Sequence, residues 1–125
     1  MSINVEKKEL GKLNDEIQRV MGARLMSVQF ILDYLILGFD EHGALTLLVW
    51  PEIIDNGTTS VSGHTGYRDK LCSLIGESVK SASGESDEVI NILFDNGAHM
   101  RIPLKMKTFG ERAILTGANN YLCVF

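Results

Sequence analysis

Hydrophobic residues near the start of the chain recur every three or four positions, which places them on one face of a helix. Asn4 is a candidate cap for this helix, and Gly22 is a candidate stop. The residues that share the apolar face are Leu10, Leu13, Ile17, Val20 and Met21. The pattern therefore predicts an amphipathic helix that ends at Gly22.

After Gly22 the sequence contains runs rich in branched and aromatic residues, which are typical of strands. We predict strands over 25–32, 34–39 and 44–50, with the last two joined as a hairpin through residues 40–43. Pro51 ends the last strand because it has no N–H to donate to a ladder. The polar stretch over 52–65 predicts a long loop.

A second helix is expected beyond this loop, with Thr65 as its cap and Gly76 as its end. Its apolar face would consist of Tyr67, Leu71, Leu74 and Ile75. Strands are then predicted over 79–83, 89–94 and 98–103, the last two joined at Asp95-Asn-Gly97, and the chain closes with a hairpin over 112–125.

The two halves of the chain share a pattern of local signals. Val20-Met-Gly22 matches Leu74-Ile-Gly76 at an offset of 54, and Phe39-Asp40 matches Phe94-Asp95 at 55. Gly43-Ala44 matches Gly97-Ala98 at an offset of 54 again, so the first turn would contain one residue more than the second. At this offset Leu45 corresponds to His99. Helix caps and turns alone could produce part of this similarity, but we favour a duplicated unit.

The repeat and the hairpins together define the expected architecture. We predict one α+β domain over 1–125, with an internal repeat over 5–51 and 66–103. Its duplicated helix-strand-hairpin units would form an antiparallel sheet, strongly curved or split into a sandwich or half-barrel, with two helices. A chain of 125 residues with 45% hydrophobic content is long enough to bury one core.

Composition bears on where the protein acts. The first ten residues are polar and lack the apolar segment of a secretory signal, and no stretch reaches the roughly 18 apolar residues of a membrane helix. We therefore expect a cytoplasmic protein that does not bind membranes. Cys72 and Cys123 have apolar neighbours, which favours buried free thiols.

Charge is distributed unevenly although the net charge is only -4. No Lys or Arg occurs from residue 25 to residue 67, whereas this segment holds Asp33, Asp40, Glu41, Glu52 and Asp55. Such a surface attracts cationic partners and opposes binding to nucleic acid. We therefore predict a basic protein partner at Asp40, Glu41, Glu52, Asp55 and His64. The alternative is that these carboxylates only keep the hairpin from aggregating.

Motifs for chemistry are missing from the sequence. None of His42, His64 and His99 has another ligand at metal spacing, and no nucleophile or phosphate-binding motif occurs, so we assign no catalytic residue, metal or cofactor. His99 is expected to be a half-buried structural residue. A cavity lined by Trp50, His64 and Tyr67 would instead support a small-molecule-binding domain or a minor enzyme.

The run Gly66-Tyr-Arg-Asp-Lys-Leu-Cys-Ser-Leu-Ile-Gly76, followed by the Phe-Asp-Asn-Gly hairpin, resembles a group of small bacterial proteins of unknown function. Similar-looking small domains occur as immunity proteins of bacterial toxin systems. The resemblance covers residues 20–115 and carries over no catalytic or binding residue. It implies a non-enzymatic protein-binding module that inhibits a toxin domain by stoichiometric binding. A further alternative is a structural domain that associates with itself, as a homodimer paired through an edge strand.

Overall fold

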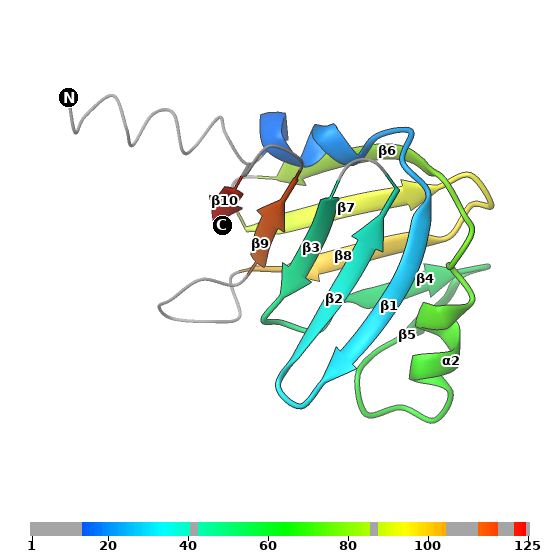
Figure 1. Ribbon diagram of the computed structural model, residues 1–125. Helices are drawn as coiled ribbons and strands as arrows, with labels where there is room; N and C mark the ends of the chain where they lie inside the picture. The colour runs from blue at the N-terminus through cyan, green and yellow to red at the C-terminus, as the bar shows by residue number, and fades with distance from the viewer. Residues whose placement is uncertain (1–13, 41–42, 86–87, 105–112, 118–121, 125) are drawn as a thin grey trace.

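The computed structural model describes residues 14–40, 43–85, 88–104, 113–117 and 122–124, the last of these by their backbone alone. Its strands form two antiparallel sheets of five strands each, accompanied by short helical segments (Figure 1). The predicted α+β class is therefore confirmed. The strands divide between two sheets.

The first sheet has the strand order β1-β2-β3-β9-β10. Its strands are β1 (Leu25–Ile31), β2 (Tyr34–Phe39), β3 (Gly43–Leu47), β9 (Ala113–Thr116) and β10 (Leu122–Val124). The two predicted hairpins are confirmed, because β2 pairs with β3 and β9 with β10. β3 ends at Leu47, three residues before the predicted end at Trp50, because the chain then crosses to the second sheet.

The second sheet has the strand order β5-β4-β8-β7-β6. Its strands are β4 (Glu52–Asp55), β5 (Thr58–Ser60), β6 (Val79–Glu85), β7 (Val89–Phe94) and β8 (His99–Pro103). The predicted loop over 52–65 is wrong, since β4 and β5 form a hairpin there. Asn56 and Gly57 make its turn with φ values of 51° and 77°, as a tight two-residue hairpin turn requires.

The first helix is shorter in the described residues than predicted. One α-helical turn at 14–17 passes into the 3-10 helix η1 (Gln18–Val20), while residues 1–13 lie outside the described chain. Ile17 and Val20 are buried as expected, but Met21 is 43% exposed. Met21 has already left the helix for an extended conformation, so helical periodicity does not apply to it.

The second helix, α2 (Tyr67–Cys72), also departs from the prediction at its ends. Its N-cap is Gly66, at φ 84°, and not Thr65. Tyr67, Leu71 and Leu74 are buried, but Ile75 is 44% exposed because the turn after α2 is wound more tightly than an α-helix. Cys72 is a free thiol that is exposed and not buried, since it follows buried Leu71 and points to the next face.

The two central hairpins have turns of equal length. Phe39 pairs with Gly43, and Phe94 donates its N–H to Ala98 O at 2.9 Å, so three residues separate each pair. The predicted extra residue in the first turn is therefore wrong, and the offset of 55 continues into the return strands. His99 then corresponds to Ala44 and not to Leu45, which explains why it faces away from the core.

The two helix ends exchange equivalent backbone hydrogen bonds. Gly22 N donates to Val79 O at 2.8 Å, and Gly76 N donates to Leu25 O at 2.7 Å. Both glycines have positive φ, at 83° and 96°, where a side chain would be strained. An antiparallel bridge between Arg24 and Ser78 lies between these bonds. The start of one half of the chain is therefore joined to the start of the other.

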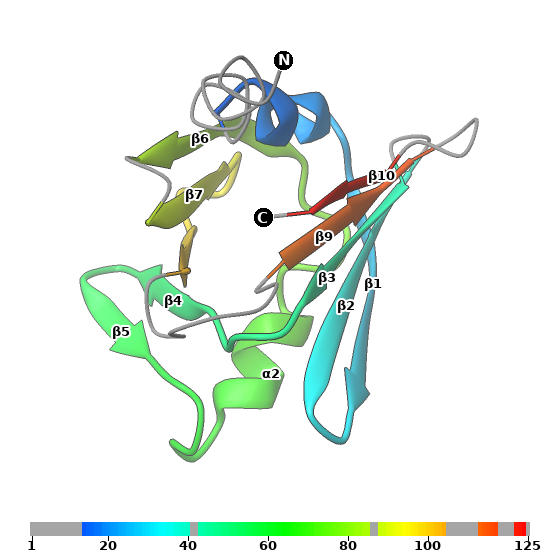
Figure 2. The same cartoon turned by 90° about the vertical axis from the view of Figure 1, so that its left-hand side faces the viewer.

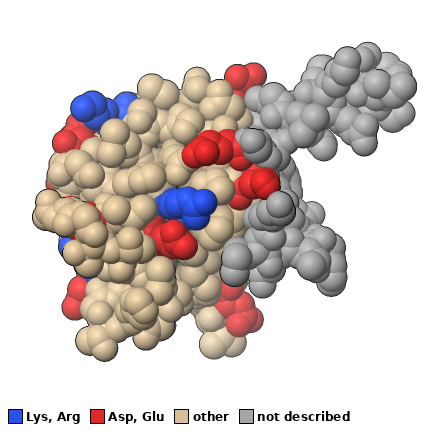
Figure 3. Space-filling model, turned by 180° about the vertical axis from the view of Figure 1, so that it is seen from behind, with Lys and Arg blue, Asp and Glu red and all other residues tan. Residues whose placement is uncertain are grey.

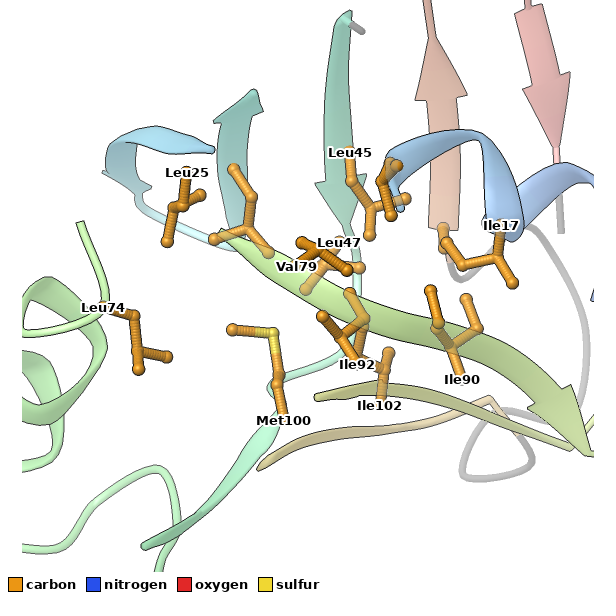
Figure 4. Packing of buried hydrophobic residues seen from close by; sticks show 14 of the residues in the cluster. Ile17, Leu25, Leu45, Leu47, Leu74, Val79, Ile90, Ile92, Met100 and Ile102 are labelled. Atoms are coloured by element: carbon orange, nitrogen blue, oxygen red, sulfur yellow. The ribbon is translucent and has the colours of Figure 1, made fainter. Parts of the chain in front are cut away.

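Residues from both sheets and both helical segments form one hydrophobic core (Figure 4). Leu45 and Leu47 enter it from the first sheet, and Ile92 and Met100 from the second. Figure 2 shows the sheets on either side of this interior, with α2 at their lower end. α2 therefore lies where the strands of neither sheet cover the space, and it positions the site described next.

Candidate functional site

A pocket of about 440 Å³ lies against the start of α2. We call it the α2 pocket, and it is lined by Trp50, Ser62, Gly63, His64, Gly66, Tyr67, Arg68 and Asp69. The volume falls within the roughly 300–1,000 Å³ of ligand pockets. The three residues predicted for a ligand cavity, Trp50, His64 and Tyr67, thus line the same pocket.

The floor of the α2 pocket is held by packing and by one buried hydrogen bond. Tyr67 is buried, and its hydroxyl donates to the backbone O of Pro51. Burial raises the pKa of the Tyr67 phenol, and the negative charge of Glu52 raises it further, so Tyr67 is neutral at physiological pH. Trp50 packs against the core from the segment just before β4. Both rings are therefore fixed walls of the pocket.

Of the two charged residues that line the α2 pocket, Arg68 contacts an aromatic ring, whereas Asp69 forms no ion pair among the described residues. The guanidinium carbon of Arg68 lies 5.0 Å from the ring centroid of Phe30 on β1, within the range of a cation–π contact. Asp69 is exposed in the first turn of α2, and its carboxylate has no ion-pair partner among the described residues. The pocket is therefore lined by an acidic residue, Asp69, together with the aromatic residues Trp50 and Tyr67.

The acidic residues of the Lys- and Arg-free segment acquire basic partners in the fold. Asp55 lies 3.0 Å from Lys70 on α2, and Glu52 lies 3.6 Å from Arg101 on β8. Both cations come from later in the chain than the acidic segment. The negative charge that the sequence concentrates around β4 is thus offset locally by residues that only the fold brings there.

The remaining predicted acidic residues lie elsewhere. Asp40 follows β2 in the first sheet, where its carboxylate accepts a hydrogen bond of 2.7 Å from Arg24 N. Glu41 lies outside the described residues. The structure therefore gathers Glu52 and Asp55 on β4 with the α2 pocket residue Tyr67, and it leaves Asp40 in the other sheet.

A polar row on the outer face of the second sheet was not anticipated. His99 Nε2 donates to Asn91 Oδ1 at 2.9 Å, and Asn91 Nδ2 donates to Glu85 Oε1 at 2.5 Å. His99 is half-buried, as predicted. Figure 3 shows this side of the molecule, with a basic side chain set among acidic ones. Only the alternation of the strands indicated that such residues would share a face.

Sequence reasoning also missed Arg68 and Asp69 as pocket residues. Both directly follow Tyr67 and lie outside the apolar face predicted for this helix, so no local signal pointed to them. Their position beside Trp50 depends on the crossing between the two sheets, which local patterns do not reveal. The α2 pocket was therefore predictable in part, from its aromatic residues alone.

Comparisons with known protein families, curated proteins and solved structures give no match. Within the described part of the chain, no three His, Cys, Asp or Glu side chains gather as metal ligands would. The helices of that part are all too short or too polar to cross a bilayer. Function is therefore inferred from the chemistry of the α2 pocket.

Proposed function

We propose that this protein is a non-enzymatic protein-binding module whose α2 pocket receives a cationic side chain of a basic partner. The observation that carries the proposal is that Trp50 and Asp69 line one pocket, while the Asp69 carboxylate has no ion-pair partner among the described residues. A cation is attracted to an aromatic face, most strongly to Trp, and to a carboxylate. An arginine or lysine side chain can make both of these interactions, one with Trp50 and one with Asp69.

The protein's own cations near the pocket are already engaged. Lys70 pairs with Asp55, Arg101 pairs with Glu52, and Arg68 lies over Phe30. Asp69 is thus the carboxylate left for an incoming group. Trp, Tyr and Arg are also the residues that contribute most to protein interfaces.

An immunity-type inhibitor is the form of this function that the resemblance in the α2 segment suggests. Such a protein would act in the cytoplasm and cover a basic site of a toxin domain. Electrostatic attraction of this kind raises the rate of association and weakens with salt. The ion pairs of Glu52 and Asp55 leave Asp69 as the main source of attraction at the pocket.

The pocket can be tested with a matched pair of probes. Trp50 is the only tryptophan of the chain, so its fluorescence reports on the α2 pocket directly. We expect a peptide with one arginine at its centre to change this fluorescence, and the same peptide with the neutral isostere citrulline to change it far less. Asp69→Asn should weaken arginine-peptide binding by about tenfold, the effect of a charged hydrogen bond.

Asp95→Asn is the control, because Asp95 is an exposed carboxylate in the β7–β8 turn, away from the pocket. It should leave binding unchanged. Equal responses to the arginine and citrulline peptides would contradict the proposal. So would an Asp69→Asn variant that binds the arginine peptide as well as the unmodified protein does.

The same pocket supports a second candidate function, the binding of a small molecule. Its volume and the imidazole of His64 beside two aromatic rings suit a metabolite of modest size. A thermal-shift screen of metabolite classes should then show stabilisation by one class, and His64→Ala should remove that shift. Stabilisation that survives His64→Ala would argue against this use of the pocket.

We also propose that the two sheets form a sandwich built from a duplicated helix-strand-hairpin unit. Three features support this: the equal central turns, the equivalent bonds at Gly22 and Gly76, and a bulge near the start of both β1 and β6. In this proposal Leu25 corresponds to Val79, and each bulge is followed by a serine, Ser27 or Ser81.

A further inference from the structure

The outer face of the first sheet carries no charged side chain in the described chain. None of its five strands contains a charged residue, whereas β4, β6 and β8 of the second sheet do. Along β2 and β3 the core residues alternate with half-buried ones that point outward. Figure 1 shows this face toward the viewer, with no described element crossing it.

Register pairing identifies which residues stand side by side on this face. Ile36 of β2 pairs with Thr46 of β3, and Thr46 pairs in turn with Ile114 of β9. Tyr34 stands opposite Ile31 of β1. These positions are half-buried within the chain itself. The face is thus a continuous uncharged surface with branched and aromatic side chains at its centre.

The second sheet provides an internal comparison for the central pair. The Asn91–Arg101 pair occupies the place that Ile36–Thr46 occupies in the first sheet, at the offset of 55 set by the equal turns. The same position in a hairpin of this shape therefore accepts a charged residue. The fold does not require an uncharged face, so the absence of charge on the first sheet has another cause.

The comparison extends to the edges of this pair. Where the second sheet has His99 outward, the first has Ala44, and where the second has Glu85, the first has Ile31. Each replacement on the first sheet removes a polar or ionisable group. An uncharged surface of this extent is typical of one that is covered by another protein.

The relief of the face suits a second copy of the same chain. Ser27, Gly38, Ala44 and Thr116 form one low row across four strands, and Ile36, Thr46 and Ile114 stand higher in the next row. A Cβ on Gly38 would collide with Ser27 Oγ, so a larger residue there requires the Ser27 side chain to move. Under a two-fold axis the high row of each copy packs into the low row of the other.

Charge also favours a second copy, and the area indicates a weak dimer. An identical uncharged face meets this one without like-charge repulsion. The five strands are about 4.8 Å apart and three to seven residues long, so the face covers roughly 400 Å². Two such faces bury about 800 Å² in total, which is the size of a weak or transient interface.

We infer that the protein forms a homodimer in which the outer faces of the two first sheets pack against each other. The contact is isologous, with Ile36, Thr46 and Ile114 of both copies at its centre. No residue of the α2 pocket takes part. The result for this interface is therefore separate from the result for the proposed function.

Sedimentation velocity of the full chain over about 5 to 500 µM tests this inference. We expect the mass to rise from 13.8 kDa toward twice that value with concentration. Thr46→Arg places at the centre of the interface the residue that the matched position of the second sheet already holds. The dissociation constant should rise about a hundredfold or more, because the two arginines meet across the axis.

Ile36→Asn is a milder variant that copies Asn91, and it should weaken the dimer without adding charge. Ser83→Arg is the matched control, because it adds the same charge to the outer face of the second sheet and should leave dimerisation unchanged. Thermal unfolding of each variant shows whether it is folded. A monomeric unmodified protein throughout this range would overturn the inference, as would an equally stable Thr46→Arg dimer.

Discussion

Tyr67 contributes both to the stability of the protein and to the shape of the α2 pocket. Its ring is part of the buried core, while its hydroxyl donates to Pro51 O in the segment that positions Trp50. A buried carbonyl that loses its donor keeps the cost of desolvation without compensation. The residue therefore fixes the distance between α2 and the start of β4.

Tyr67→Phe should lower the free energy of unfolding by about 1–2 kcal/mol at pH 7, the cost of leaving the Pro51 carbonyl unpaired. The raised pKa of Tyr67 also predicts a pH dependence. The unfolded phenol ionises near pH 10, below the folded one, so the Tyr67 contribution is fully present below about pH 10 and is lost as pH rises further.

Urea unfolding of both proteins between pH 7 and 11 measures this effect. The unmodified protein should lose more stability above pH 10 than Tyr67→Phe does, because only it carries the shifted phenol. Parallel stability curves for the two proteins above pH 10 would contradict the assigned burial of the hydroxyl.

At the scale of elements, the joint between the two helix ends is the connection on which both halves depend. Gly22 and Gly76 end their helical segments with positive φ, and each donates its N–H across to the other half. An added Cβ would meet no atom within 4 Å at either position. The requirement for glycine there is thus conformational and not steric.

Gly22→Ala and Gly76→Ala should each destabilise the protein by about 1–2 kcal/mol, the strain of a left-handed backbone with a side chain. Because their surroundings are equivalent, the two losses should agree within about 0.5 kcal/mol. Chemical denaturation measures both. Ser81→Ala, at an exposed position of β6, is the control and should change stability by less than about 0.5 kcal/mol. A loss at one glycine alone would show that the two ends are not equivalent.

Elements with strong local signals were predictable, and those that depend on distant partners were not. The hairpin at Asp95-Asn-Gly97 follows from its turn residues, and β2 and β7 begin and end where their apolar runs do. Residues 52–65, which include β4, were predicted as a loop because the stretch is polar as a whole and contains Asn56-Gly57. Ile53 is buried only because β4 adds to β8, where its partner Met100 lies 47 residues later in the chain.

For the whole molecule, the single core predicts that the sheets unfold together. Leu37 of the first sheet and Ile92 of the second are fully buried at equivalent places in the two central strands. Each side chain contacts a core to which both sheets contribute. Neither sheet has an interior of its own, so loss of packing in one is felt by both.

Leu37→Ala and Ile92→Ala should each cost about 2–5 kcal/mol, the loss of buried methyl groups plus the cavity left behind. For both variants, unfolding followed by Trp50 fluorescence and by far-UV circular dichroism should coincide. Separate transitions for the two signals would show that the sheets are independent units. Ile54→Ala, at a half-buried outward position of β4, is the control and should cost much less.

The candidate site shows the same division between local and distant effects. Trp50, His64 and Tyr67 could be grouped from sequence because they lie within one short stretch of chain. The charge of the surface could not be derived in this way. Counting residues from 25 to 67 suggested an acidic patch, whereas Lys70 and Arg101 arrive from later elements and pair with Asp55 and Glu52.

The sequence by itself determined the features that short-range forces control. Glycines such as Gly22 and Gly76 end helices because they accept positive φ, Asn-Gly pairs turn hairpins, and alternation selects the buried side of each strand. Only the tertiary structure decided how the strands divide between two sheets, which cations meet the acidic strand, and which face stays uncharged and open. Those outcomes depend on pairing between residues far apart in the chain, whose free energy no local pattern contains.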